Sequence, residues 1–347
     1  MPSLCDPVSS AVSLRLRGTV TAAFSYHDEG MNLSYRSRRV LLAFLIYLAS
    51  GTVAGIYVAD GTLQPGRRPL TNEETAAVRD SVRDLGGDLA DVSITTPDRV
   101  SLSAWLIRPQ LTNGNAVILL HGLGDNRLGM TGYAKLFLDH GFSVLLPDAR
   151  GHGVSGGSLV TYGLIERSDI HQWVGVLQTQ VHPQCIFGLG ESMGAAELLQ
   201  SLATRPDFCA VAAESSFADF REIAYDRMGQ AFHAGPWLGR TILRPVVEVA
   251  FLRVRWKYGL DMQTVSPEQS IANSKIPVLL IHGQADGNIP LRHARMIHAQ
   301  DPNAVLWEVP NADHCGAVSV APKEFQDRIL DWFSSNPENV ATQRNSP

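Results

Sequence analysis

The chain has 347 residues, of which 45% are hydrophobic and 18% are charged, with 30 glycines and 19 prolines. These proportions exclude a disordered chain, a collagen-like chain, a coiled coil and a small disulfide-stabilised protein. The formal net charge of −5 excludes a basic surface covering the whole chain, as a nucleic-acid-binding protein would need. The mean hydropathy is close to zero, so one part of the chain must be unusually apolar.

That part is the segment of residues 40–59 (VLLAFLIYLASGTVAGIYVA), which contains no charge and no proline. As an α-helix it would be about 30 Å long, which matches the hydrocarbon core of a bilayer. Three arginines precede the segment closely and two follow at a greater distance: Arg36, Arg38, Arg39, Arg67 and Arg68. This asymmetry favours a single-pass membrane anchor with the N-terminus in the cytoplasm and the rest of the chain outside.

Two other interpretations of this segment stay open. It could be a cleaved signal peptide, with Val40–Leu48 as its apolar region and the small residues of 52–54 near the cleavage point, which would leave a secreted or periplasmic protein. It could also be a buried core helix. Residues 1–39 are predicted to be an N-terminal tail, in which 1–30 show no periodicity and Met31 is an alternative start.

A linker and one helix follow the apolar segment, within residues 60–91. Gln64–Arg68 is predicted to be the linker. Thr71–Glu74 (TNEE) fits a capping box, in which Thr71 and Glu74 satisfy each other's backbone amides at a helix start. Gly86 and Gly87 are suited to end that helix.

Between residues 92 and 336, short apolar runs alternate with helical patterns. The predicted strands are Val92–Thr95, Leu102–Ile107, Val117–Leu120, Ser143–Leu146, Ile186–Leu189, Ala210–Ala213, Val278–Ile281 and Val305–Val309. The predicted helices are Gly132–His140, Leu164–Val181, Gly194–Thr204, Leu291–Ala299 and Lys323–Phe333. Wholly apolar strands are typical of a parallel sheet covered on both faces. The pattern predicts an α/β fold with a mostly parallel eight-stranded sheet, and 337–347 as a C-terminal tail.

One connection is too long to be an irregular loop, since about 60 residues separate the strands that end at Ala213 and begin at Val278. Residues 218–272 are therefore predicted to be a helical lid insertion. Within it, Thr241–Lys257 places basic residues between apolar ones. That pattern is typical either of a helix at a membrane interface or of a lid helix with a solvated face.

The four cysteines show no C-x-x-C spacing and no metal-ligand pattern with histidines: Cys5, Cys185, Cys209 and Cys315. Cys185 and Cys209 begin apolar runs that are predicted to be buried strands. We therefore expect them to be free buried thiols rather than a disulfide.

A candidate nucleophile lies in the sequence GESMG at 190–194, directly between a predicted strand and a predicted helix. A chain that turns sharply from strand to helix needs glycine on both sides, and the turn exposes the hydroxyl of Ser192. The start of a helix also favours negative charge at this position.

A serine nucleophile needs a base and a carboxylate that orients the base. Asp286 follows the strand 278–281, and His314 follows the strand 305–309. Because the carboxyl ends of parallel strands share one edge of a sheet, Ser192, Asp286 and His314 can converge there, in the order expected for this arrangement. Asp313 is the competing acid. His121 and His152 also follow strands, but they are expected to shape loops.

An acyl-transfer site also needs donors for the developing oxyanion. The strand 117–120 runs into HGLG at 121–124, a glycine-rich turn at the same edge of the sheet. The backbone N–H groups of Leu123 and Met193 are therefore the predicted oxyanion donors.

From about Val92 to Phe333, the chain resembles the α/β-hydrolase superfamily, and within it hydrolases with a serine-aminopeptidase-like domain. The resemblance rests on five motifs in family order: HGLG (121–124), DARGHGVSGG (148–157), GESMG (190–194), HGQAD (282–286) and DH (313–314). It implies an α/β-hydrolase fold, Ser192 as nucleophile, Asp286 as acid, His314 as base, and Leu123 and Met193 as oxyanion donors. Asp148, Arg150 and Gly151 match a loop that is mainly structural in that family. Phe217–Ile271 carries no subfamily signature, and this is the region where substrate choice usually resides.

The expected activity is hydrolysis of a carboxylic ester, with an acyl or lipid-like substrate, through a Ser-His-Asp triad and without a metal or organic cofactor. Two alternatives stay open: a serine peptidase of the same fold, in which Glu191 or Glu214 would hold a free amine, and a catalytically silent binding protein tethered to a membrane. The expected partners are a small ester substrate and a membrane, but no nucleic acid. The sequence does not indicate an oligomeric state.

Overall fold

The computed structural model describes residues 34–205, 207–272 and 274–337. The predicted tail of residues 1–30, the alternative start at Met31 and most of the predicted C-terminal tail lie outside these ranges. The chain divides into two compact units, residues 1–46 and 47–347.

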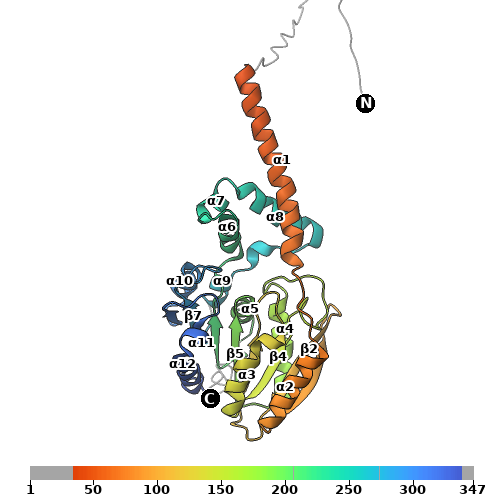
Figure 1. Cartoon of the computed structure of the whole chain (residues 1–347), viewed down its shortest axis with the longest axis vertical. Helices are drawn as coiled ribbons and strands as arrows, with labels where there is room; N and C mark the ends of the chain where they lie inside the picture. The colour runs from red at the N-terminus through yellow and green to blue at the C-terminus, as the bar shows by residue number, and fades with distance from the viewer. Residues whose placement is uncertain (1–33, 206, 273, 338–347) are drawn as a thin grey trace, which may run out of the picture. The chain divides into compact units, whose positions relative to one another are not determined.

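One helix, α1 (Tyr35–Leu63), contains the apolar segment and extends it in both directions (Figure 1). Among the described residues it is the one helix long and apolar enough to cross a membrane, by length and composition. Its apolar side chains from Val40 to Ile46 are exposed. Gly51, Gly55, Ala59 and Leu63, spaced by four residues on one face, are buried. The final turns of α1 therefore belong to the second unit and are packed within it.

An eight-stranded sheet forms the centre of the second unit, in the order β1-β2-β4-β3-β5-β6-β7-β8. The strands are β1 (Asp88–Thr95), β2 (Ser101–Arg108), β3 (Ala116–Leu120), β4 (Ser143–Pro147), β5 (Ile186–Glu191), β6 (Ala210–Glu214), β7 (Val278–Gly283) and β8 (Val305–Val309). Strand β2 runs antiparallel to β1 and β4, and all other neighbours are parallel. The predicted mostly parallel sheet is confirmed.

Helices cover both faces of this sheet, as the wholly buried central strands require (Figure 1). One face packs on α2 (Asn72–Asp84), α3 (Thr131–Asp139), α11 (Ala317–Val320) and α12 (Pro322–Ser334). The other face packs on α4 (Glu166–Gln180), α5 (Met193–Ser201) and α10 (Arg292–Gln300). The capping box predicted for α2 is present, since the Thr71 side chain accepts from the Glu74 amide and the Glu74 carboxylate accepts from the Thr71 amide.

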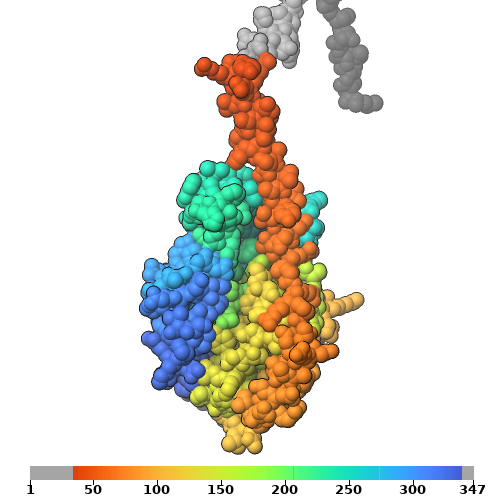
Figure 2. Space-filling model, in the orientation of Figure 1, coloured from red at the N-terminus to blue at the C-terminus, as the bar shows by residue number. Residues whose placement is uncertain are grey.

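The long connection between β6 and β7 is helical. It contains α6 (Phe220–Gln230), α7 (Pro236–Arg240), α8 (Arg244–Tyr258), η2 (Met262–Thr264) and α9 (Pro267–Ile271). A third apolar cluster joins this insertion to the end of α1, with Ala59, Leu63, Val247 and Phe251 among its members. Figure 2 shows the teal insertion directly against the orange end of α1.

The prediction of free thiols at Cys185 and Cys209 is wrong, because the two residues form a disulfide with a Cα–Cα distance of 5.8 Å. They directly precede β5 and β6, which are parallel neighbours with Phe187 paired to Ala210. Parallel pairing places the two strand starts side by side, and the sequence alone does not reveal that register. Cys315 is a free cysteine.

Candidate active site

The turn from β5 to α5 places Ser192 in a backbone conformation that residues with a side chain rarely adopt, with φ 52° and ψ −111°. A Cβ on Gly190 would lie 2.6 Å from the Gly194 carbonyl, and one on Gly194 would lie 2.4 Å from the Leu120 carbonyl oxygen. Both contacts are too short for any side chain, so glycine is required on each side of Ser192. The predicted sharp strand-to-helix turn is therefore present, with the serine at its apex.

The structure brings Ser192, His314 and Asp286 into one hydrogen-bonded chain. Ser192 Oγ lies 2.9 Å from His314 Nε2, and His314 Nδ1 lies 2.9 Å from an Asp286 carboxylate oxygen. The three residues follow β5, β7 and β8, whose carboxyl ends meet at one edge of the sheet. This is the geometry in which a base takes the proton of a serine while a carboxylate holds the base in the correct tautomer.

Asp286 is held rigidly in its position opposite the ring of His314. Its second oxygen accepts hydrogen bonds from the backbone amides of Asn288 (2.9 Å) and Ile289 (2.8 Å). Burial acts to raise the pKa of Asp286, but the hydrogen bonds from His314 and Ile289 outweigh it and hold the pKa below its usual value. The group is therefore a carboxylate that can stabilise a positively charged imidazole.

The competing acid, Asp313, has a different set of partners. Its carboxylate accepts from the backbone amides of Gly287 (3.1 Å) and His314 (2.8 Å). It thereby joins the loops after β7 and β8 and fixes the backbone that carries His314. Neighbours in sequence point their side chains differently, which is why the distant Asp286 contacts the ring.

Sequence reasoning missed a second histidine beside the acid. His282 is fully buried, and its Nε2 lies 3.4 Å from the Asp286 carboxylate and 2.7 Å from the Ile289 carbonyl oxygen, to which it donates. Burial lowers its pKa, so the ring is neutral and holds the loop that carries Asp286. Its position in HGQAD (282–286), four residues before the acid, was the available signal.

Two buried histidines shape the turn that carries Leu123. His121 Nε2 accepts from the Ala149 amide (3.1 Å), and His152 Nε2 accepts from the Gly124 amide (3.1 Å). Burial lowers the pKa of both rings, that of His152 to about 4. Neutral rings can accept these bonds, which fit the predicted loop-shaping role. Leu123 and Met193 both line the same cavity as Ser192.

The loop of residues 148–157 is held by two buried ion pairs and a third whose carboxylate, that of Asp98, is exposed. Asp148 pairs with Arg127 at 2.7 Å, and Arg150 pairs with Asp169 at 2.7 Å and with Asp98 at 2.8 Å. All of these partners lie outside the Ser192 cavity lining. The contacts support the structural role expected for Asp148 and Arg150.

Two carboxyl groups, the partly buried Glu191 and the buried Glu214, share the phenol of Tyr133 behind the nucleophile. Its hydroxyl donates to Glu191 and, at 3.4 Å, to Glu214, which also accepts from the Ala317 amide. Burial and the neighbouring Glu191 raise the pKa of Glu214 to about 8. Burial also raises the pKa of Glu191. Glu191 lines the cavity whereas Glu214 does not, so Glu214 is badly placed to hold the amine of a peptide there.

Ser192 and His314 open into a cavity of about 620 Å³, a volume typical of pockets that enclose a small ligand. Most of its walls are apolar and come from the helical insertion, including Phe220, Ile223, Val247, Ala250, Phe251 and Val254. The end of α1 supplies a further wall with Val58, Ala59, Thr62 and Leu63. Sequence reasoning missed this wall; the four-residue spacing of Gly51, Gly55 and Ala59 was the signal for close helix packing.

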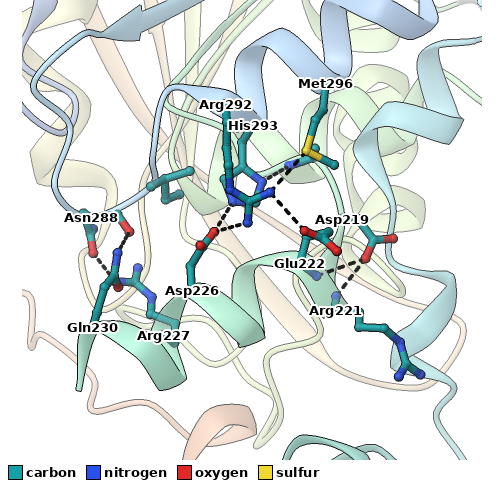
Figure 3. A network of polar contacts seen from close by, with 12 residues as sticks. Asp219, Arg221, Glu222, Asp226, Arg227, Gln230, Asn288, Arg292, His293 and Met296 are labelled. Atoms are coloured by element: carbon teal, nitrogen blue, oxygen red, sulfur yellow. Dashed lines mark hydrogen bonds and ion pairs between the residues drawn. The ribbon is translucent and has the colours of Figure 1, made fainter. Parts of the chain in front are cut away.

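Ion pairs fix the insertion over the sheet edge, between α6 and α10 (Figure 3). The buried carboxylate of Asp226 pairs with Arg292 at 2.5 Å and with His293 Nε2 at 2.7 Å. Glu222 pairs with Arg292 at 2.9 Å and also with Arg240. These contacts hold the roof of the cavity in place relative to the loop that carries Asp286.

Most of the basic residues of the insertion are paired with carboxylates, whereas Arg227 contacts the amide oxygens of Gln230 and Asn288. Arg240 contacts Glu222, Arg244 contacts Glu248, Arg255 contacts Asp261, and Arg253 and Lys257 contact Asp60 of α1. Leu252 and Trp256, between them, are exposed. In the part of the chain that the structure describes, no three His, Cys, Asp or Glu side chains are grouped as metal ligands would be.

Comparison with known proteins agrees with this architecture. A family model described as the alpha/beta hydrolase family matches residues 117–328. The protein YqkD of Bacillus subtilis is 31% identical, over 64% of this chain and 72% of its own. The thermostable monoacylglycerol lipase of Bacillus sp. strain H-257 is 29% identical, over 63% of this chain and 90% of its own. A solved structure, the Pyrococcus furiosus esterase Pf2001, superposes with a TM-score of 0.62 and 26% identity, covering 79% of this chain and 98% of that one.

The matched residues 117–328 contain the central strands, the sharp turn at Ser192 and the loops that carry Asp286 and His314. The resemblance drawn from the sequence motifs is therefore confirmed at the level of the superfamily. The chain belongs to the alpha/beta hydrolase family.

Proposed function

We propose that this protein is a serine hydrolase that cleaves carboxylic esters through an acyl-enzyme on Ser192. The observation that carries the proposal is the chain of two 2.9 Å contacts from Ser192 through His314 to Asp286, at the floor of an apolar cavity. The monoacylglycerol lipase and the esterase among the similar proteins are both named for ester hydrolysis.

In this mechanism, Ser192 Oγ attacks the ester carbonyl carbon while His314 Nε2 takes its proton. The carbonyl oxygen becomes an oxyanion, which the backbone N–H groups of Leu123 and Met193 stabilise. The imidazolium, stabilised by Asp286, returns the proton to the departing alcohol as the acyl–oxygen bond breaks. A water molecule, activated by His314, then attacks the acyl-enzyme in the same way and releases the carboxylic acid and free Ser192.

The assignment of Ser192 can be tested by labelling the protein with a fluorophosphonate. We expect the parent to be labelled and Ser192→Ala to lose both the label and ester turnover, with kcat reduced by at least about 10⁴-fold. Ser216→Ala is the matched control, because Ser216 is buried near the same sheet edge and donates to the Phe217 carbonyl oxygen. Equal labelling of the parent and Ser192→Ala would refute the assignment.

Esterase and peptidase activities are separated by substrate. We expect turnover of p-nitrophenyl esters and none of aminoacyl anilides. Of the two candidates for holding an amine, Glu214 is buried outside the cavity, and Glu191, which lines it, already accepts from the Tyr133 hydroxyl. Anilide turnover that exceeds ester turnover would instead support the peptidase. Absence of labelling together with absence of turnover of both substrate classes would favour the catalytically silent binding protein.

We further propose that α1 anchors the protein in a membrane with the catalytic unit on the extracytoplasmic side. The apolar side chains from Val40 to Ile46 are exposed, and three arginines directly precede them. The Cys185–Cys209 disulfide supports the same topology, because such bonds persist in oxidising compartments.

Fusions at the C-terminus test this topology in bacterial cells. We expect alkaline phosphatase to be active in the fusion and green fluorescent protein to be dark, and the protein to stay in membranes washed with carbonate. Release by carbonate would contradict the anchor and favour a cleaved signal peptide. A fluorescent fusion would contradict the proposed orientation.

A further inference from the structure

The end of α1 is built into the cavity that contains Ser192, although it lies more than 120 residues away in sequence. Val58, Ala59, Thr62 and Leu63 form one face of the helix and line that cavity together with His314. Ala59 and Leu63 are only 2% and 1% exposed. An anchor that merely tethered a complete enzyme would not need to contribute to its cavity.

Close packing fixes the position of this helix end against α8. A Cβ on Gly55 would lie 2.7 Å from the Val246 carbonyl oxygen and from Val249 Cβ, so only glycine allows the two helices to approach this far. One turn earlier, Gly51 faces Pro245 at 3.4 Å by the same measure. The four-residue spacing continues to Ala59, where the packed face becomes the cavity wall.

Hydrogen bonds also hold the last turns of α1 in place. Asp60 accepts from Lys257 Nζ and from the Tyr258 hydroxyl, each at 3.0 Å. The Tyr162 hydroxyl donates to the Thr62 carbonyl oxygen at 2.8 Å, and the Val160 amide donates to the Leu63 carbonyl oxygen at 2.9 Å. These contacts come from α8 and from the loop before α4. The wall is therefore held in place and is as much a part of the cavity as the helical insertion.

We propose that the last two turns of α1 bind the acyl chain of the ester substrate. This inference rests on the proposed function, because it concerns the cavity of that same site. The adjoining walls, from the end of α1 and from Val247, Phe251 and Val254 of α8, carry apolar side chains suited to an alkyl chain. Each buried methylene of such a chain raises the binding constant by about fourfold.

Val58 is the position at which chain length can be altered with little disturbance to the fold. It lines the cavity but is only half-buried, so a larger side chain can be accommodated without repacking the core. Val53 offers a matched control on the same helix, because it is 69% exposed and lies outside the cavity lining.

The experiment measures kcat/KM for p-nitrophenyl esters from acetate to palmitate, with the full-length protein in detergent micelles. In Val58→Phe we expect esters of eight or more carbons to lose at least tenfold, while acetate stays within threefold of the parent. Val53→Phe should keep the parental profile. Thr62→Leu, which enlarges a second residue of the same wall, should shift the profile in the same direction as Val58→Phe. Labelling by a short-chain fluorophosphonate verifies that each variant is folded.

The outcomes separate the inference from the proposed function. If Val58→Phe and Thr62→Leu label normally and keep the parental chain-length profile, α1 does not bind the acyl chain, while the ester hydrolase stands. An equal loss in Val53→Phe would also overturn the inference, since the effect would then come from the anchor as a whole. If the parent neither labels at Ser192 nor hydrolyses any ester, the proposed function fails and the inference fails with it.

Discussion

Removing the Cys185–Cys209 disulfide should lower the free energy of unfolding by a measurable amount. The bond joins residues 24 positions apart, and closing a loop of that length in the unfolded chain costs conformational entropy worth about 3.5 kcal/mol at 25 °C. Domains are typically stable by about 5–15 kcal/mol. The double variant Cys185→Ala/Cys209→Ala should therefore lose a large fraction of the total stability.

Unfolding in guanidinium chloride, followed by tryptophan fluorescence in detergent, measures this difference. With a denaturant dependence of about 6 kcal/mol per molar, the midpoint should fall by roughly 0.6 M. Dithiothreitol should lower the midpoint of the parent and leave that of the double variant unchanged. The variant Cys315→Ala is the matched control, because Cys315 is free and its removal should leave the response to dithiothreitol intact.

Alkylation provides an independent test of the bond itself. In the denatured but unreduced parent, iodoacetamide should modify Cys315 and leave Cys185 and Cys209 unmodified. Modification of Cys185 and Cys209, together with a midpoint that does not respond to dithiothreitol, would refute the disulfide and the compartment that we infer from it.

Three further predictions follow from the site and its supports. Asp286→Asn should lower kcat toward esters by about 10⁴-fold, because the neutral amide no longer holds the correct tautomer of His314. Asp313→Asn alters only backbone contacts and should change kcat by less than tenfold. Similar losses of kcat in both variants would contradict the assigned acid. The pKa of Glu214 is raised from 4.5 to about 8, so this group stays protonated in the folded protein while it ionises in the unfolded chain. Its contribution to the free energy of unfolding therefore falls between about pH 4.5 and 8 and is constant above pH 8. Glu214→Gln should therefore gain stability relative to the parent across that window, by a few kcal/mol at pH 8, as measured by denaturant unfolding; a difference independent of pH would contradict this reasoning. Asp226→Ala should destabilise the protein by about 1–3 kcal/mol, because the buried His293 loses its carboxylate partner while Arg292 keeps Glu222. Limited proteolysis should then cut within residues 218–272. Asp226→Asn should be milder, and cleavage elsewhere would argue against this role.

The type and order of the core elements can be predicted from local patterns in the sequence. Wholly apolar strands alternating with amphipathic helices follow from local periodicity, and that periodicity is sufficient to predict a parallel sheet with both faces covered. The turn at Ser192 was also readable, because steric exclusion at Gly190 and Gly194 acts between residues close in sequence. The convergence of Asp286 and His314 followed from the rule that parallel strands end at one edge.

Features that depend on strand register and on packing between distant segments become apparent only in the folded chain. Cys185 and Cys209 pair because β5 and β6 are neighbours in the sheet. Local periodicity does not predict the order of the strands in a sheet. The apolar N-terminal segment contains two different parts, an exposed stretch and a packed end that lines the cavity. Hydropathy weighs both parts equally, since it records how apolar a side chain is and not what it contacts.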